Sequence, residues 1–188
     1  MRRLIVFNQV SLDGFIADAK GDMSWAHKDP QDEEWNAFVA GNAQGGGELL
    51  FGRITYELMA SFWPTPMAMK AAPAVAEGMN RMPKTVFSRT LDQASWSNTR
   101  LVKRDIAGQV KKMKSESGPD IVILGSGSIV SQLTGAGLID EYHMVVNPII
   151  LGDGKTMFAG LKARLALKLT QSRTFANGNV LLCYEPAA

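Results

Sequence analysis

The stretch that decides the fold is Ile121-Val122-Ile123-Leu124-Gly125-Ser126-Gly127-Ser128. Its first four residues form a continuous apolar run, which is typical of a strand covered on both faces. A glycine-containing turn follows and leads into a predicted helix that ends near Thr134. The stretch Leu49-Leu50-Phe51-Gly52-Arg53-Ile54-Thr55 has the same form. Both stretches therefore predict a strand, a tight turn and a helix start.

The rest of the chain alternates strands and helices and ends in strands only. An apolar run begins at Leu4, and helices are predicted over about 30–43 and from Asp105 to about Ser117. The segments 165–175 and 179–185 alternate polar and apolar residues around an Ala-Asn-Gly turn, which predicts a hairpin. The pattern indicates an α/β fold with a mostly parallel central sheet and a C-terminal antiparallel hairpin.

Composition limits the domain count and the classes of function. The chain has 188 residues, 46% hydrophobic and 20% charged, which fits one domain over residues 1–188. The single Cys183 excludes an internal disulfide, and His27 and His143 lack metal-ligand spacing, so no metal site is expected. A net charge of +2 does not favour nucleic acid, and no apolar stretch is long enough for a membrane span. We expect a cytoplasmic protein.

Three strand ends carry groups that suit phosphates. Free N–H groups at helix starts attract anions, and glycine lets a phosphate approach the backbone closely. Arg53 and Thr55 add a cation and a hydroxyl to the first turn, and Ser88-Arg89-Thr90 offers a similar set after a strand that ends at Phe87. Ordinary strand-to-helix turns explain either glycine turn taken singly. Together they suggest a dinucleotide, and the third cluster suits the extra phosphate of NADPH.

These motifs resemble those of the dihydrofolate reductase superfamily, and more closely its branch that contains the reductase domain of bacterial riboflavin biosynthesis. The resemblance covers nearly the whole chain. It rests on these segments: Val10-Ser11-Leu12-Asp13-Gly14-Phe15-Ile16-Ala17, Phe51-Gly52-Arg53-Ile54-Thr55-Tyr56-Glu57, Pro83 to Leu91, Ile123 to Ser128, Ile139 to Tyr142, and Pro148 to Gly154.

The resemblance implies a dihydrofolate-reductase-like, three-layer α/β/α fold and NADPH as hydride donor. The residues that it assigns to the cofactor are Gly52, Arg53, Thr55, Ser88, Arg89, Gly125, Ser126, Gly127 and Ser128. It also implies a cis peptide bond at Gly125-Ser126. A homodimer is a further expectation, for which the apolar segment Met144-Val145-Val146 and the loop from Pro148 to Leu151 are candidate contacts, although core burial explains them equally well.

The substrate side rests on three residues. By resemblance, Asp32 binds an amidine-like edge of a pteridine or pyrimidine and supports protonation, but it also fits an acid at a helix start. Asp13 is expected near the nicotinamide as a second catalytic candidate, with a turn residue before Gly14 as the alternative. Trp25 is a candidate for substrate binding, and a pocket wall or core position explains it as well.

The sequence thus predicts an NADPH-dependent reductase of a small heterocycle, similar to 5-amino-6-(5-phosphoribosylamino)uracil reductase or dihydrofolate reductase. Two alternatives stay open at this point. The first is a reductase of unrelated carbonyl compounds, and the second is a nucleotide-binding sensor or structural protein without turnover.

Overall fold

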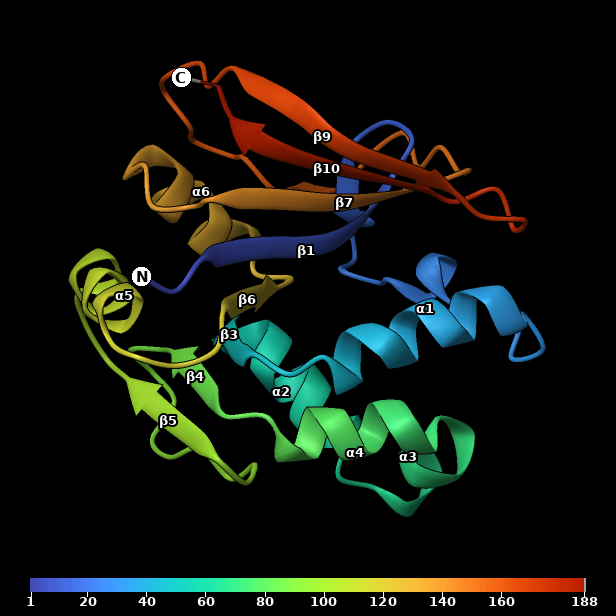
Figure 1. Ribbon diagram of the computed structural model, residues 1–188, viewed down its shortest axis with the longest axis horizontal. Helices are drawn as coiled ribbons and strands as arrows, with labels where there is room; N and C mark the ends of the chain where they lie inside the picture. The colour runs from blue at the N-terminus through green and yellow to red at the C-terminus, as the bar shows by residue number, and fades with distance from the viewer. Residues whose placement is uncertain (188) are drawn as a thin grey trace.

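An eight-stranded sheet runs through the middle of the protein in the computed structural model, which describes residues 1–187 (Figure 1). Its strands are β1 (Leu4–Ser11), β3 (Glu48–Gly52), β4 (Lys84–Phe87), β5 (Thr99–Val102), β6 (Ile121–Leu124), β7 (Glu141–Asn147), β9 (Leu167–Thr174) and β10 (Val180–Pro186). They lie in the order β5-β4-β3-β6-β1-β7-β10-β9. The pairings from β5 to β7 are parallel, and β10 is antiparallel to both neighbours. The predicted sheet and terminal hairpin are confirmed.

Helices cover both faces of this sheet. They are η1 (Ser24–Ala26), α1 (Glu33–Gln44), α2 (Arg53–Phe62), α3 (Pro66–Ala71), α4 (Pro73–Arg81), α5 (Ile106–Ser115) and α6 (Gly127–Gly135). A second sheet of two strands pairs β2 (Phe15–Ala17) with β8 (Lys155–Thr156). No helix among residues 1–187 is both long and apolar enough to cross a membrane.

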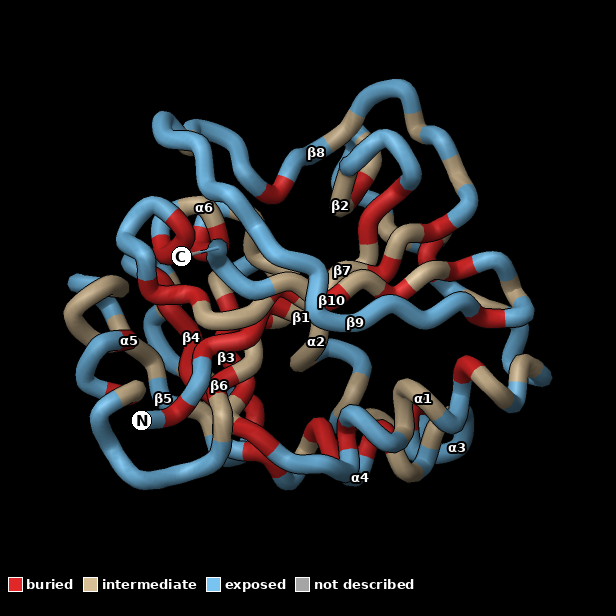
Figure 2. The backbone as a smooth tube through the Cα atoms, turned by 45° about the horizontal axis from the view of Figure 1, so that its top comes forward, coloured by how far each residue is buried: buried red, intermediate tan, exposed pale blue. Residues whose placement is uncertain are grey.

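Side chains of the central strands alternate between two cores, as the period of two in a strand requires. Leu4 and Val6 of β1 join the core beneath α5 and α6, whereas Phe7 packs in the aromatic cluster beneath α1. A third cluster joins Leu49 and Phe51 of β3 to α2 and α4. Figure 2 shows that the buried backbone is concentrated along these inner strands. Burial on both faces explains the continuous apolar runs.

The element boundaries differ from the sequence prediction in a few places. The first helix begins after Asp32 and not at Pro30, because the Asp32 carboxylate accepts the N–H of Trp35 and caps the helix. Pro73 separates α3 from α4. The edge strand β5, over 99–102, was not predicted from the sequence. It pairs with β4 alone.

The strand proposed as a dimer contact lies inside the sheet. β7 pairs with β1 on one side and β10 on the other, so its backbone edges are already used. Val145 is buried in the cluster beneath α1. Core packing, the alternative interpretation, therefore accounts for this segment. The free edge on that side of the sheet belongs to β9, all of whose residues are exposed.

Candidate functional site

A large cavity of about 860 Å³ opens at the carboxyl ends of the central strands. Its walls include parts of β1, β3, β6 and β7 of the sheet, of α1, α2 and α4, and the start of α6. Ligands of parallel α/β sheets generally bind at this edge, and the volume is typical of a site for a cofactor and a small molecule. The nine residues predicted to bind a cofactor all line this one cavity: Gly52, Arg53, Thr55, Ser88, Arg89, Gly125, Ser126, Gly127 and Ser128.

The two glycine turns are bonded directly to each other. The N–H of Gly52 donates to Oγ of Ser126 over 2.6 Å. The hydroxyl of Ser126 donates to Oγ1 of Thr55 over 3.1 Å, and the N–H of Ser126 donates to the same oxygen over 3.1 Å. The start of α2 and the start of α6 are therefore held side by side, although 71 residues separate Thr55 from Ser126.

Gly125 lies too close to Thr55 to carry a side chain. A Cβ atom there would lie 2.7 Å from Oγ1 of Thr55 and 2.8 Å from its Cγ2. The backbone is left-handed at Gly125 (φ 61°) and at Ser126 (φ 56°). The predicted cis bond between these residues is wrong: residues 1–187 contain no cis peptide bond, and the two left-handed residues make the tight turn instead.

The helices that start at the cavity have no side-chain cap. Asp32, Thr65 and Asp105 cap α1, α3 and α5 through hydrogen bonds to the first turn. The starts of α2 and α6 have no such bond. Their first-turn N–H groups thus keep the positive end of each helix dipole open toward the cavity, where an anion would be stabilised.

The charges on the cavity wall have one sign. Arg53, Arg89 and Lys155 line it, and no carboxylate does among the described residues. Arg53 also pairs with Glu57 one helical turn away, at 2.8 Å, with both side chains about half exposed. Arg89 is exposed after β4 and forms no ion pair within residues 1–187. This wall suits a ligand with several negative charges.

Ser88 supports the turn that carries Arg89. Its buried hydroxyl oxygen accepts the N–H groups of Thr90 and Leu91, at 3.2 and 2.9 Å. The turn after β4 is thereby fixed at the cavity edge. Ser88 and Arg89 were both predicted to bind the cofactor. The Ser88 hydroxyl is used within the turn, so the guanidinium of Arg89 is the group available to a ligand.

The three residues predicted for the substrate side lie outside the cavity wall. Asp32 caps α1 and also accepts from Asn177 at 2.7 Å, which ties the helix to the C-terminal hairpin. Trp25 lies on η1 and donates its indole N–H to the carbonyl of Asp22.

Asp13 organises a loop. Its carboxylate accepts the hydroxyl of Ser11 and the N–H groups of Leu151 and Gly152, and these bonds lower its pKa. Asp13 and Asp32 thus form the hydrogen bonds expected of a turn residue and of a helix cap. Their catalytic roles stay predictions.

Asn8 and His143 also line the cavity, and sequence reasoning did not select either as a site residue. Asn8 follows the apolar run of β1, and its side chain accepts the N–H of Gly125 at 2.6 Å and donates to the Gly125 carbonyl at 3.4 Å. His143 lies within β7 and also faces the cavity. A polar residue directly after an apolar run was the available signal for Asn8. Nothing in the sequence alone indicated that His143 faces a cavity.

Comparisons with known proteins agree with this architecture. The chain is 30% identical over 184 residues to the uncharacterized protein YyaP of Bacillus subtilis (strain 168), covering 98% of this chain and 95% of YyaP. Its fold is similar to that of a putative riboflavin biosynthesis protein from Shewanella sp. PV-4, with a TM-score of 0.77, 23% identity and 99% of each chain covered. It is also similar to dihydrofolate reductase from Enterococcus faecalis in complex with NADP(H), with a TM-score of 0.61 and 15% identity over 99% of this chain and 97% of that one.

A family model also matches nearly the whole chain. The model of the RibD C-terminal domain matches residues 2–181, which include the whole cavity wall. The resemblance stated from the sequence motifs is therefore confirmed, and with it the dihydrofolate-reductase-like fold. The chain belongs to the RibD C-terminal domain family.

Proposed function

We propose that the protein is an NADPH-dependent reductase of a small heterocyclic compound, pyrimidine-like or pteridine-like. One observation carries the proposal: two uncapped helix starts, bonded to each other, open into a cavity whose charged side chains are all cationic. NADPH carries a pyrophosphate and a third phosphate, so it needs this combination.

The residues of the chain would divide the cofactor between them. The N–H groups at the starts of α2 and α6 suit the pyrophosphate. Arg89 and Arg53 suit the remaining phosphate charge, and the turn at Gly125 suits the nicotinamide end, because Asn8 fixes this turn against β1. When bound, NADPH would supply a hydride. The protein holds the two reactants in position.

The remaining wall suits a flat, largely apolar substrate. Phe7 of β1 and Val39 of α1 provide apolar surface, and Gln9 and Asn42 provide hydrogen-bonding groups. A pyrimidine or pteridine ring has matching faces and edges. The lack of a carboxylate on this wall favours a second candidate, a carbonyl compound without a basic amidine edge, on the same cofactor platform.

Cofactor affinity tests the proposal. Arg53→Ala and Arg89→Ala should each weaken NADPH binding more than NADH binding, by about tenfold, because each removes a charge-assisted phosphate contact of about 1.5 kcal/mol. Arg81→Ala is the matched control, because Arg81 also pairs with an acid four residues away but lies outside the cavity wall. Dissociation constants from tryptophan fluorescence give the answer. Equal losses for both cofactors would refute the phosphate assignment.

Turnover separates the enzyme from the alternative of a sensor. An NADPH oxidation assay against pteridines, pyrimidines and simple carbonyl compounds should show reduction of at least one class. Tight NADPH binding without turnover on any of them would favour a nucleotide-binding sensor.

A further inference from the structure

We propose that His143 donates the proton that completes the reduction. The inference rests on the proposed reductase function and adds a residue to it. Reduction of a C=O or C=N bond needs a proton for the heteroatom as well as a hydride for the carbon. Among the described residues of the cavity wall, the titratable side chains are Arg53, Arg89, Lys155 and His143. Of these, histidine alone exchanges a proton readily near neutral pH.

Strand register places His143 beside the ring site. Leu124 of β6 pairs with Phe7 of β1, and Phe7 pairs with His143 of β7. The three residues form one row on the α1 face of the sheet, because paired residues of parallel strands share a face. Neighbouring strands lie about 4.8 Å apart, so His143 is roughly 10 Å across the sheet from the Leu124-Gly125 turn. A flat ring that lies over Phe7 would span that gap.

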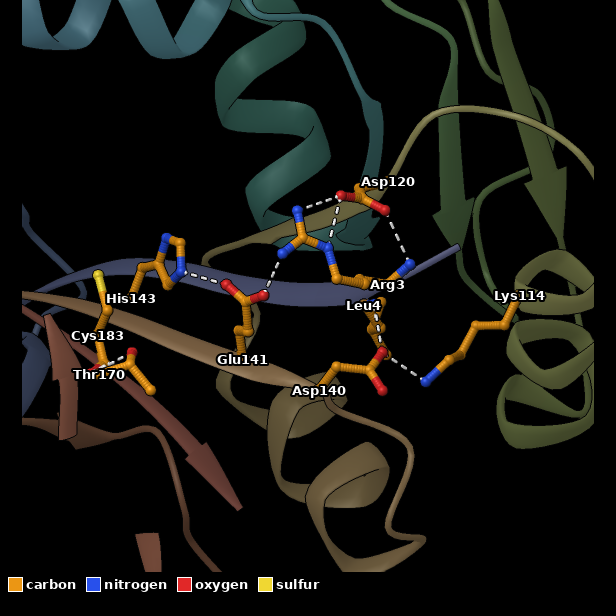
Figure 3. A network of polar contacts seen from close by, with 9 residues as sticks. All are labelled: Arg3, Leu4, Lys114, Asp120, Asp140, Glu141, His143, Thr170 and Cys183. Atoms are coloured by element: carbon orange, nitrogen blue, oxygen red, sulfur yellow. Dashed lines mark hydrogen bonds and ion pairs between the residues drawn. The ribbon is translucent and has the colours of Figure 1, made fainter. Parts of the chain in front are cut away.

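Glu141 orients the imidazole. Its Oε2 lies 2.8 Å from Nε2 of His143, and its Oε1 binds Arg3. Arg3 in turn binds Asp120. Figure 3 shows this chain of contacts, with the second ring nitrogen of His143 pointing away from Glu141. Because a carboxylate can only accept, the Nε2 atom carries a proton, and Nδ1 is the atom left for a ligand.

The other neighbour in the row does not compete for the proton. Cys183 of β10 pairs with His143 across the strands. Burial, and then the charge of Glu141, raises the pKa of its thiol. The thiol therefore keeps its proton, and Glu141 is the carboxylate in contact with the imidazole. His143 and Glu141 are 27% and 16% exposed, so water screens their interaction only partly.

The step balances as follows. The Nδ1–H bond of the imidazolium breaks and its proton forms the O–H or N–H bond of the product, while the carbon accepts the hydride that NADPH supplies on its oxidation to NADP⁺. His143 becomes a neutral imidazole that is still held by Glu141. It regains a proton from water at the open side of the cavity.

The kinetic test uses two probes: 9,10-phenanthrenequinone for C=O and 7,8-dihydrofolate for C=N. His143→Gln should lower kcat for the probe that the wild-type protein reduces by about 100-fold or more, while the NADPH dissociation constant stays within twofold. Glu141→Gln should lower kcat less, by about tenfold, with KM unchanged, because Glu141 acts by positioning the ring. His27→Gln is the control and should leave kcat unchanged, since His27 is exposed outside the cavity wall.

A second readout does not depend on turnover. The chain has two histidines, so ¹⁵N NMR of the NADP⁺-loaded protein should give two sets of imidazole signals. Adding either probe should move the signals of His143 and not those of His27. Glu141→Gln should reduce the share of the Nε2–H tautomer.

The possible outcomes distinguish the two proposals. A wild-type protein that binds no NADPH, or that reduces neither probe, overturns the reductase for these substrates and the proton donor with it. Wild-type turnover together with His143→Gln turnover within threefold of it overturns the proton donor alone. Unmoved His143 signals with a bound probe have the same consequence.

Discussion

The contact between Gly125 and Thr55 can be tested by adding a single methyl group. In a Gly125→Ala variant the new Cβ would lie 2.7 Å from Oγ1 and 2.8 Å from Cγ2 of Thr55. Thr55 must then rotate, and it loses the two hydrogen bonds that Ser126 donates to it. At about 1 kcal/mol for each bond, the variant loses about 2 kcal/mol beyond the cost of its left-handed backbone.

Gly137→Ala supplies the matched control for the backbone cost. Gly137 has φ 63° against 61° for Gly125, and nothing lies within 4 Å of its added Cβ. Urea unfolding followed by tryptophan fluorescence should therefore give a Gly125→Ala variant less stable than Gly137→Ala by about 2 kcal/mol, or roughly 4–8 °C in Tm for a chain of this length.

The same measurement in a Thr55→Ala background isolates the clash. Without Oγ1 and Cγ2 in the way, Gly125→Ala should cost no more than Gly137→Ala. Equal losses for the two glycine variants in the wild-type background would refute the contact. A difference that persists in the Thr55→Ala background would show that Thr55 is not its cause.

Three further predictions follow from side chains with defined partners. Asp32→Ala should lower stability by about 1 kcal/mol in urea unfolding, because the cap of α1 is lost, and leave NADPH affinity unchanged; a fall in affinity would contradict the capping role. The hydroxyl of Ser11 and the loop N–H groups lower the pKa of Asp13 below 3.8, so the ionised Asp13 stabilises the fold above that pH. In urea unfolding, the greater stability of the wild type over Asp13→Asn should disappear as the pH falls below about 4. Burial lowers the pKa of Lys84 from 10.5 to about 8, so between these pH values the unfolded chain binds more protons than the folded one. The stability of the wild type should therefore rise with pH relative to that of Lys84→Met. Parallel profiles of stability against pH for the two proteins would count against the shift.

The fold was predictable because its signals are local. The strands at the centre of the sheet carry apolar side chains on both faces, so apolar runs stand out in the sequence, as at 121–124. The turn at 176–178 marked the hairpin equally well. The edge strand β5 gave no such signal, because its residues are only partly buried and pair on one side.

The candidate site was predictable only in part. Glycine turns at strand ends indicated the cofactor half, because the chemistry of anion binding is contained in each short motif. The bonds that hold the two turns together join residues 71 and 74 positions apart, which no motif reveals. His143 was overlooked for the same reason: its position depends on register with Phe7, a property of the folded sheet.

Sequence reasoning gave less guidance for carboxylates. Asp32 and Asp13 each had a local structural alternative, a helix-start acid and a turn residue, and the structure provides partners for both alternatives. A short polar side chain next to a turn or a helix start usually bonds the nearby backbone. A nearby acid is therefore weak evidence for catalysis unless its position relative to a cavity is known.

The strand order also determines when the site can form during synthesis. β6 lies between β3 and β1, although both of these strands precede it in the chain by 68 residues or more. Until residues 121–124 leave the ribosome, β6 is missing, and it is the strand that connects β1 to β3 in the sheet. A nascent chain that ends before this point has neither the shared wall nor the turn at Gly125. Ligand rescue of folding can therefore act only after the last third of the protein has begun to emerge.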